Sequence, residues 1–196
     1  MVSRMLEILY RKNNPAAPWL TSTANLVLSS LLKPEDVGVE FGAGRSTIWL
    51  AGRIKSLTSV EHDKYWFERV VLQLKKANLE NVSSFLTEKS LAPGDLPGYL
   101  SVFDNLSRNS LDVILVDGLF RDRCALSAVE YLKSGGVLII DNANLYLPSN
   151  SASPNSLAVS SPPATDVWNV FLSATASWRR IWTSNGVYDT AIYLKP

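Results

Sequence analysis

The chain has 196 residues, of which 46% are hydrophobic, enough for one substantial core and too few for two full domains, so we expect one domain over residues 1–196. Its 19 Lys and Arg residues nearly balance 18 Asp and Glu residues, which excludes the global basic field typical of proteins that bind nucleic acid or anionic membranes. The single cysteine excludes an internal disulfide, and with no apolar run of signal-peptide or membrane-spanning length we expect a cytoplasmic protein without a membrane partner.

The first 33 residues are expected to form an N-terminal helical segment. Residues 13–19 are rich in turn-forming residues, and Thr21 or Ser22 can cap a helix that ends near residue 32. Trp19 is a candidate wall for a pocket, although packing or capping would also account for a tryptophan at this place.

An apolar run that contains Glu40 leads into a glycine-rich turn and then into a helix-like stretch, which predicts a strand, a tight turn and a helix start. Gly42 and Gly44 lack Cβ atoms, so the turn can take positive φ and let a ligand lie against the main chain. Ser46 and Thr47 stand where a helix N-terminus offers hydroxyls and amide N–H groups to an anionic group. Glu40 at the strand tip repels phosphate and suits a ligand that carries a positive charge.

A second strand is predicted at residues 56–61, and its last residue, Glu61, lies 21 residues after Glu40. In doubly wound nucleotide-binding folds a carboxylate at this place accepts hydrogen bonds from both ribose hydroxyls. Glu61 is therefore the ribose candidate, and His62 is expected either beside the cofactor or merely in solvent, rather than in catalysis or metal binding. Glu88, after a later strand, is expected either near an adenine or in a plain exposed loop.

Apolar strands alternate with helices along the middle of the chain, which is the signature of a mostly parallel sheet. Asp117, Asp141 and Asn142 follow two of these strands, and ligands of such sheets bind at the carboxyl ends of the strands. The predicted elements are helices at 63–77 and 122–132 and strands at 82–87, 111–118 and 137–142.

Residues 143–165 are rich in Ser, Pro and Asn, and they are expected to form either a lid over the site or a disordered loop. A helix is predicted from Asp166. After it, residues 178–183 and 190–194 flank an Asn-Gly turn, which predicts an antiparallel hairpin.

Four motifs in this order resemble those of the class I S-adenosylmethionine-dependent methyltransferases. They are the Glu-Phe-Gly-Ala-Gly run at 40–44, the Val-Glu-His-Asp run at 60–63, the Leu-Val-Asp-Gly run at 115–118 and the Gly-Gly-Val-Leu-Ile-Ile-Asp-Asn run at 135–142. The resemblance implies a Rossmann-like, doubly wound α/β sheet of seven strands, mostly parallel, with a C-terminal antiparallel pair. It also implies S-adenosylmethionine as cofactor, held by Glu40, Gly42, Gly44, Ser46, Thr47, Glu61, His62, Glu88 and Asp117.

Asp117, Asp141 and Asn142 further resemble the divalent-metal site of the catechol-type O-methyltransferases. That resemblance implies a possible Mg²⁺ ion on these three residues, since hard oxygen ligands suit the ion. The lysine base of those enzymes is replaced here by Phe120 or, with one inserted residue, by Arg121, which stays protonated. In the alternative interpretation Asp117 and Asp141 contact cofactor and acceptor directly.

Methyl transfer to a small-molecule acceptor, favoured at oxygen, is the function that these features predict, with Asp117 or Asp141 as the catalytic carboxylate. A nicotinamide-dependent oxidoreductase is an alternative, weakened by the lack of a third glycine after the Gly-Ala-Gly turn. A cofactor-binding module without turnover is another, because the lysine base is missing. No nucleic-acid acceptor is expected, given the near-zero net charge and the lack of an Asn/Asp-Pro-Pro-aromatic tetrapeptide.

Overall fold

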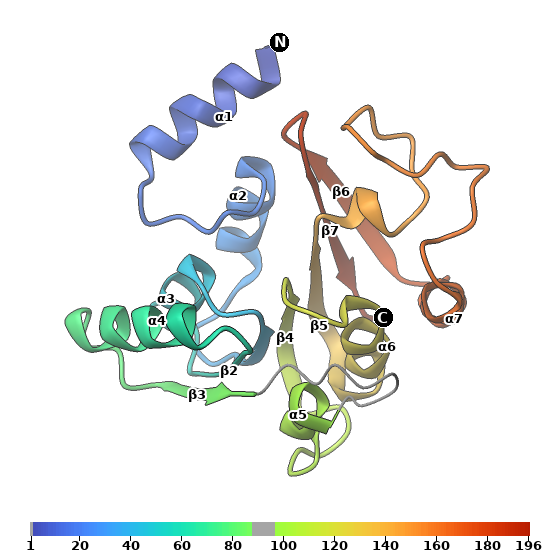
Figure 1. The fold of residues 1–196 in the computed structure, drawn as a ribbon. Coiled ribbons are helices and arrows are strands. Elements are labelled where there is room, and N and C mark those ends of the chain that lie inside the picture. The colour runs from blue at the N-terminus through green and yellow to red at the C-terminus, as the bar shows by residue number, and fades with distance from the viewer. Residues whose placement is uncertain (1, 88–96) are drawn as a thin grey trace.

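The computed structural model describes residues 2–87 and 97–196, so Glu88, the expected adenine contact, lies outside the described residues. The strands form one seven-stranded sheet in the order β3-β2-β1-β4-β5-β7-β6 (Figure 1). The strands are β1 (Val37–Phe41), β2 (Ser56–Glu61), β3 (Val82–Leu86), β4 (Leu111–Val116), β5 (Leu132–Asp141), β6 (Arg179–Ser184) and β7 (Asp189–Leu194).

The pairing confirms the predicted sheet. Strands β1 to β5 pair in parallel, whereas β7 runs antiparallel to both β5 and β6. In the hairpin turn, Asn185 Oδ1 accepts hydrogen bonds from the backbone N–H groups of Val187 and Tyr188, and Gly186 has a positive φ of 81°. The carboxyl ends of the parallel strands therefore meet at one edge, where ligands of such sheets bind.

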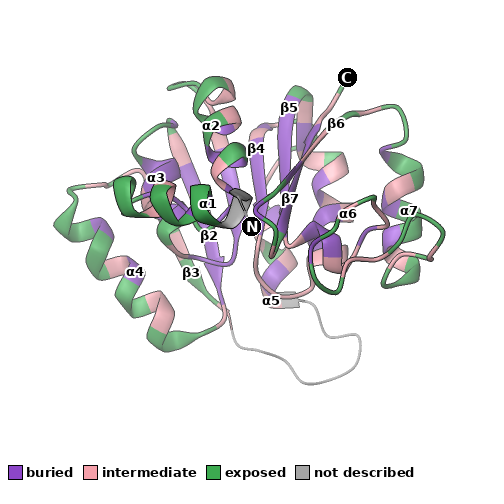
Figure 2. Ribbon diagram, turned by 90° about the horizontal axis from the view of Figure 1, so that it is seen from above, coloured by how far each residue is buried: buried purple, intermediate pink, exposed green. Residues whose placement is uncertain are grey.

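Helices cover both faces of the sheet (Figures 1 and 2). Because both faces are covered, β4 and β5 carry consecutive apolar residues, at 113–116 and 137–140, rather than alternating with polar residues. The helices are α1 (Val2–Asn13), α2 (Ser22–Leu31), α3 (Arg45–Ala51), α4 (Lys64–Lys76), α5 (Pro97–Leu100), α6 (Arg121–Tyr131) and α7 (Asp166–Ala174), with short 3-10 helices η1 (Ser101–Phe103) and η2 (Ala143–Leu145). None of these described helices is both long and apolar enough to cross a membrane.

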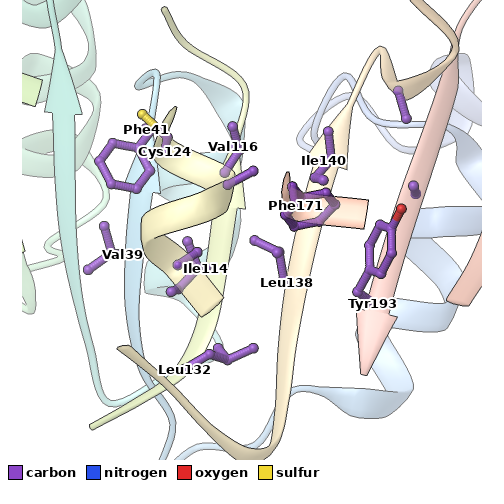
Figure 3. Packing of buried hydrophobic residues seen from close by; sticks show 14 of the residues in the cluster. Val39, Phe41, Ile114, Val116, Cys124, Leu132, Leu138, Ile140, Phe171 and Tyr193 are labelled. Atoms are coloured by element: carbon purple, nitrogen blue, oxygen red, sulfur yellow. The ribbon is translucent and has the colours of Figure 1, made fainter. Parts of the chain in front are cut away.

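Alternation along β4 divides the core between the two faces. Ile114 and Val116 pack with α6 and α7, in a cluster that includes the fully buried Phe171 (Figure 3). Val113 and Leu115 point the other way and pack with α2 and α3. Side chains of a strand alternate between faces, so one short run of apolar residues supports both helical layers.

Two helices begin at polar side chains that accept hydrogen bonds from their first turns. The Thr21 hydroxyl accepts from the backbone N–H of Ala24 at the start of α2, and the Asp63 carboxylate accepts from that of Trp66 at the start of α4. Such caps satisfy amide groups that have no partner inside the helix. Asp63 follows β2 within two residues, so its cap fixes the path of the chain beside the sheet edge.

The Ser-, Pro- and Asn-rich segment after β5 is built on backbone hydrogen bonds within the described structure. Leu157 N donates to Asn144 O at 3.0 Å, and Ser149 N donates to Leu157 O at 3.0 Å. Asn144, at the base of the segment, is fully buried. The segment lies beside the β6–β7 hairpin and leads into α7 (Figure 1).

Candidate functional site

A cavity of about 550 Å³ lies at the carboxyl ends of β1, β2 and β4. Of the residues that the sequence singled out, it brings together Gly42, Gly44, Ser46, Glu61, His62, Asp117 and Trp19. Its volume lies in the range of cofactor and small-molecule sites. The other lining residues are Ala43, Arg45, Asp63, Tyr65, Trp66, Gly118, Leu119 and Arg121.

The two glycines of the turn after β1 serve different purposes. Gly42 has a φ of +97°, and a Cβ there would meet Gly118 N at 2.7 Å, so this glycine lets the loop after β1 touch the loop after β4. Gly44 has a φ of −178°, which is extended backbone open to any residue, so the expected positive φ at Gly44 is wrong. A Cβ on Gly44 would lie no nearer than 3.7 Å to other atoms, and the space that it leaves empty belongs to the cavity.

Glu40 does not line the cavity. Its side chain is fully buried beneath the glycine loop, where Oε2 accepts hydrogen bonds from the hydroxyls of Thr47 and Ser59, the latter at 2.8 Å. Burial raises the pKa of Glu40 to about 7, although the hydroxyls of Ser46, Thr47 and Ser59 oppose the rise. We expected Glu40 at a ligand's cationic group, whereas the structure places it under the loop as an internal support.

Thr47 is also beneath the loop rather than in the cavity wall. Its hydroxyl donates to Glu40 and accepts from the backbone N–H of Gly44 at 2.8 Å. Thr47 is fully buried. The expected contact between Thr47 and a ligand is therefore replaced by a contact that fixes the loop on which a ligand would lie.

Glu61 lies at the end of β2, and its carboxylate faces backbone N–H groups at the cavity wall. Oε2 accepts from Ala43 N at 2.9 Å, and Oε1 accepts from His62 N at 2.7 Å and from Asp63 N at 2.8 Å. A carboxylate has about four acceptor positions, so Oε2 retains room for a donor from the cavity. Glu61 thus joins the glycine loop to the end of β2 while it lines the cavity.

His62 lines the cavity and contacts the buried Tyr99 behind it. His62 Nδ1 is 2.9 Å from Glu61 Oε1 and 3.1 Å from the Tyr99 hydroxyl. Burial raises the pKa of Tyr99 above its ordinary value, and the Glu61 carboxylate adds to the rise. The phenol therefore remains protonated, and His62 is held in a fixed orientation by two neighbours.

Arg121 ties the carboxyl ends of β4 and β5 together. Its guanidinium N–H groups donate five hydrogen bonds, of 2.6 to 3.0 Å, to Gly118 O, Asp141 O, Asn142 Oδ1, Asp117 O and Asp117 Oδ1. An arginine has five N–H donors, so all of them are engaged by the protein. Its side chain is 14% exposed.

Asp117 and Asp141 form a pair of neighbouring carboxyl groups at these strand ends. Burial raises the pKa of Asp117, and the nearby Asp141 carboxyl raises it further, while Arg121 opposes both effects. Burial also raises the pKa of Asp141, against Arg121 and the Thr190 hydroxyl, which donates to Asp141 Oδ1 at 2.9 Å. Asp141 is buried and the Asp117 side chain is 32% exposed; two neighbouring carboxyls in this setting do not both ionise easily, so the pair retains a proton at higher pH than isolated aspartates do.

No protein-family model matches the sequence, and no curated protein matches it. Solved structures do match. A methyltransferase from Geobacter sulfurreducens has a TM-score of 0.60 at 14% identity, with 97% of this chain and 87% of that chain covered. A protein of Streptococcus mutans, described as a methyltransferase and in complex with SAH, has a TM-score of 0.58 at 13% identity, with 89% and 96% covered.

A third match is an rRNA methylase from Streptococcus thermophilus, with a TM-score of 0.54 at 15% identity and with 88% of this chain and 93% of that chain covered. The chain has the class I methyltransferase fold. The resemblance expected from the four motifs is confirmed at the level of the fold, including the seven strands and the antiparallel C-terminal pair.

The donor set at the ends of β4 and β5 in this methyltransferase fold does not fit a magnesium ion. Asp117 Oδ1 and Asn142 Oδ1 both accept from Arg121, and Asp141 Oδ1 accepts from Thr190. A divalent cation would have to stand beside the Arg121 guanidinium, which repels it and already donates to the side-chain oxygens of Asp117 and Asn142. Among the described residues no cluster of three His, Cys, Asp or Glu side chains could hold a metal. The expected Mg²⁺ site on Asp117, Asp141 and Asn142 is thus not supported.

Asp141 and Asn142 are also absent from the cavity lining. Asp141 is 7% exposed, and its hydrogen bond to Thr190 turns it toward β7. Of the two carboxylates expected to contact an acceptor, only Asp117 lines the cavity. Asp141 can act there only through its neighbour.

An aromatic wall that the sequence did not predict as a unit closes one side of the cavity. Trp66 donates from Nε1 to Ala43 O and stacks on Trp19, with ring centroids 6.2 Å apart. The Arg45 guanidinium lies 5.2 Å from the centroid of the Trp19 ring. Trp66 lies in the helix predicted at 63–77, and it was not among the residues expected at the site. The signal that could have placed it is its position, one helical turn after the Asp63 cap and five residues after Glu61.

Proposed function

We propose that the protein transfers a methyl group from S-adenosylmethionine to an acceptor. The observation that carries the proposal is the cavity itself, in which the glycine loop after β1 and the acid after β2 line one space of cofactor size at the carboxyl edge of the sheet. The match to a methyltransferase-fold protein in complex with SAH supports the same cofactor. S-adenosylmethionine, when bound, would supply an activated sulfonium methyl group.

In this proposal the glycine loop receives the amino-acid end of the cofactor. The empty space beside Gly44 and the hydroxyl of Ser46 line that part of the cavity. The amide groups at the start of α3 favour a carboxylate there, since the N-terminus of a helix attracts anions. Glu61 would accept a hydrogen bond from a ribose hydroxyl with the acceptor position that remains on Oε2, and His62 would line the same side.

Asp117 is the proposed acid–base residue for a hydroxyl acceptor. It is the one carboxylate of the pair that lines the cavity, and its pKa lies above the ordinary range, as a residue that accepts a proton near neutral pH requires. The acceptor oxygen would attack the methyl carbon as the carbon–sulfur bond breaks, and the acceptor's proton would pass to Asp117. Alignment of the reactants and exclusion of water would contribute most of the rate.

The acceptor that we propose is a small molecule, with transfer at oxygen. A formal net charge of +1 favours it over a nucleic acid. The same fold does occur in an rRNA methylase, so the fold gives no ground for the expectation that nucleic acid is excluded. A methylation assay with total RNA beside a panel of phenols and other hydroxyl compounds separates the two acceptor classes.

Isothermal titration with S-adenosylhomocysteine tests the cofactor assignment. Glu61→Gln should lower the affinity by at least tenfold, because an amide replaces the carboxylate that would accept from a ribose hydroxyl and that accepts three backbone N–H groups. Glu68→Gln on the exposed face of α4 is the matched control and should bind as the wild type does. Equal affinity of Glu61→Gln and the wild type would remove Glu61 from the site.

Gly44→Val provides a second variant that does not touch a hydrogen bond. The extended backbone at Gly44 accepts a side chain, and a Cβ there meets no close neighbour, so the variant should fold and fill the cavity. Loss of S-adenosylhomocysteine binding with an unchanged Tm supports the proposal.

Two results with the wild-type protein would indicate another function. A gain of fluorescence on addition of NADH, with no binding of S-adenosylhomocysteine, would indicate the oxidoreductase. Tight binding without any methylated product would indicate a binding module.

A further inference from the structure

A second cavity, of about 720 Å³, lies between the segment after β5 and the β6–β7 hairpin. Figure 1 shows this segment, in orange, beside the upper end of β6. No residue that lines this cavity also lines the first one. Its lining consists of Pro148, Ser149, Asn150, Ser151, Ala152, Ser153, Val159, Arg180, Trp182, Ser184 and Gly186.

One wall of the second cavity is a single face of β6. Arg180, Trp182 and Ser184 all line it, as expected for side chains two residues apart on a strand. Arg179, the neighbour of Arg180, belongs to the opposite face and is not part of the lining. The Arg180 guanidinium lies 5.1 Å from the centroid of the Trp182 ring.

A buried network of hydrogen bonds around Asp189 fixes the floor of the second cavity. Asp189 is fully buried, and its Oδ1 accepts from the Ser153 hydroxyl at 2.6 Å, while its Oδ2 accepts from Trp182 Nε1 at 2.7 Å. The Ser153 and Ser184 hydroxyls are 2.9 Å apart. These bonds hold the indole ring and two hydroxyls in place before any ligand arrives, which lowers the entropy that binding costs.

The charges around this cavity cancel. Arg180 is the only charged side chain among the described residues that line it, and the Asp189 carboxylate lies directly beneath the floor, bonded to the lining residues Ser153 and Trp182. An anion would gain from the guanidinium and lose to the carboxylate. The electrostatics therefore favour a ligand without net charge.

The hydrogen-bonding groups of the lining both donate and accept. Hydroxyls of Ser149 and Ser151 and the amide of Asn150 offer both functions, which matches ligand hydroxyls and not phosphate or carboxylate, which only accept. The Ser184 hydroxyl donates to Ser153 Oγ, whose own proton goes to Asp189, so Ser184 can only accept from a ligand. The Trp182 ring adds a flat apolar surface. From this combination we propose that the second cavity binds a neutral sugar ring, with its hydroxyls on the serines and one face on Trp182.

This proposal does not depend on methyl transfer in the first cavity. The two cavities are nonetheless linked along β7. Asp189 lies beneath the second cavity, and the next residue, Thr190, donates from its hydroxyl to Asp141, which neighbours Asp117 of the first cavity.

Saturation-transfer NMR with glucose, galactose and N-acetylglucosamine, alongside glucuronate and inorganic phosphate, tests the proposal on the full-length protein. At least one neutral sugar should bind to the wild type and to Arg179→Gln, and binding should fall at least tenfold in Arg180→Gln. The indole N–H resonance of Trp182, identified by its loss in Trp182→Phe, should shift on addition of that sugar. Saturating S-adenosylhomocysteine should leave the sugar bound.

Three results would overturn the proposal. Binding of glucuronate or phosphate without any neutral sugar would make the cavity an anion site. Displacement of the sugar by S-adenosylhomocysteine would place the sugar in the first cavity. An equal loss of sugar affinity in Arg179→Gln and Arg180→Gln, or no sugar binding at all, would show that this face of β6 does not bind the sugar.

Discussion

Glu40 and Glu61 show how one residue type at two strand ends acquires two roles. Glu40 is followed by Phe41, still within β1, so the strand continues past it and its side chain must point to a face that helices cover. Glu61 is the last residue of β2, and its side chain reaches the edge. The sequence pattern identified both acids as strand-tip residues, but a difference of one residue in the strand end decides which of them meets the cavity.

Burial of Glu40 predicts a pH dependence of stability. Its pKa is about 7 in the folded protein and 4.5 ordinarily, so the folded state binds the proton more tightly, and the stability present below pH 4.5 is lost as pH rises to about 7. Glu40→Gln should reduce this pH-dependent loss in the free energy of unfolding by about 3 kcal/mol. Urea unfolding of the wild type and the variant at pH 5 and pH 8 measures the loss in each protein. A loss of the same size in both proteins would contradict the buried position of Glu40.

Arg121 is expected to stabilise the sheet edge through its five hydrogen bonds. Arg121→Lys keeps the charge but offers three donors in place of five, which leaves carbonyl and carboxylate oxygens of two strand ends without partners. The free energy of unfolding should fall by about 2–4 kcal/mol. Arg123→Lys, on the exposed side of α6, should change it by less than about 0.5 kcal/mol. Comparable losses of stability in the two variants would contradict the role of the Arg121 hydrogen bonds at the sheet edge.

At the scale of elements, the sequence predicted the strands and most helices because each has a clear apolar period. It predicted the antiparallel hairpin from the Asn-Gly turn, and the structure confirms it. The contacts between elements were harder to predict from the sequence. Arg121 was regarded as a poor base, while its role as a link between β4 and β5 depends on a geometry that no local pattern records. The second cavity likewise arises only when residues 148–159 meet β6.

Thr190 joins three elements and provides a test of their packing. Its hydroxyl accepts from the backbone N–H of Thr21 before α2 and donates to Asp141 at the end of β5, and the residue is fully buried. Thr190→Val keeps the shape but leaves both partners unsatisfied, so we expect a loss of about 1–3 kcal/mol in denaturant unfolding. Thr23→Val on the exposed side of α2 is the control, and a loss no larger than in that control would contradict the connection.

At the scale of the whole molecule, the parallel strands bring residues from distant parts of the sequence to one edge. The first cavity joins Trp19 to Gly44, Glu61 and Asp117, and these residues come from four separate elements or loops. Composition limited the chain to one core, and strand order then decided which tips became neighbours. β1 lies between β2 and β4, so the acids of these three strands could be expected together, while Asp141 is one strand further along.

Ligand binding to this edge should stabilise the entire fold. At a concentration one hundred times its Kd, S-adenosylhomocysteine should add about 2.7 kcal/mol to the free energy of unfolding. For a chain of this size that corresponds to a rise in Tm of about 5–10 °C. Differential scanning calorimetry measures the rise, a chelator should leave it unchanged, and NADH should not reproduce it. A rise that disappears with the chelator would restore a metal to the site.

The contact between Gly42 and Gly118 has a kinetic consequence. The backbones of the two loops are in direct contact, with no side chain between them. A displacement of the loop after β1 should therefore also move the loop that carries Asp117. In the proposed function, the loop that would receive the cofactor and the loop that carries Asp117 are therefore coupled at one backbone contact. A ligand bound on the first loop should then alter how fast an acceptor binds beside Asp117.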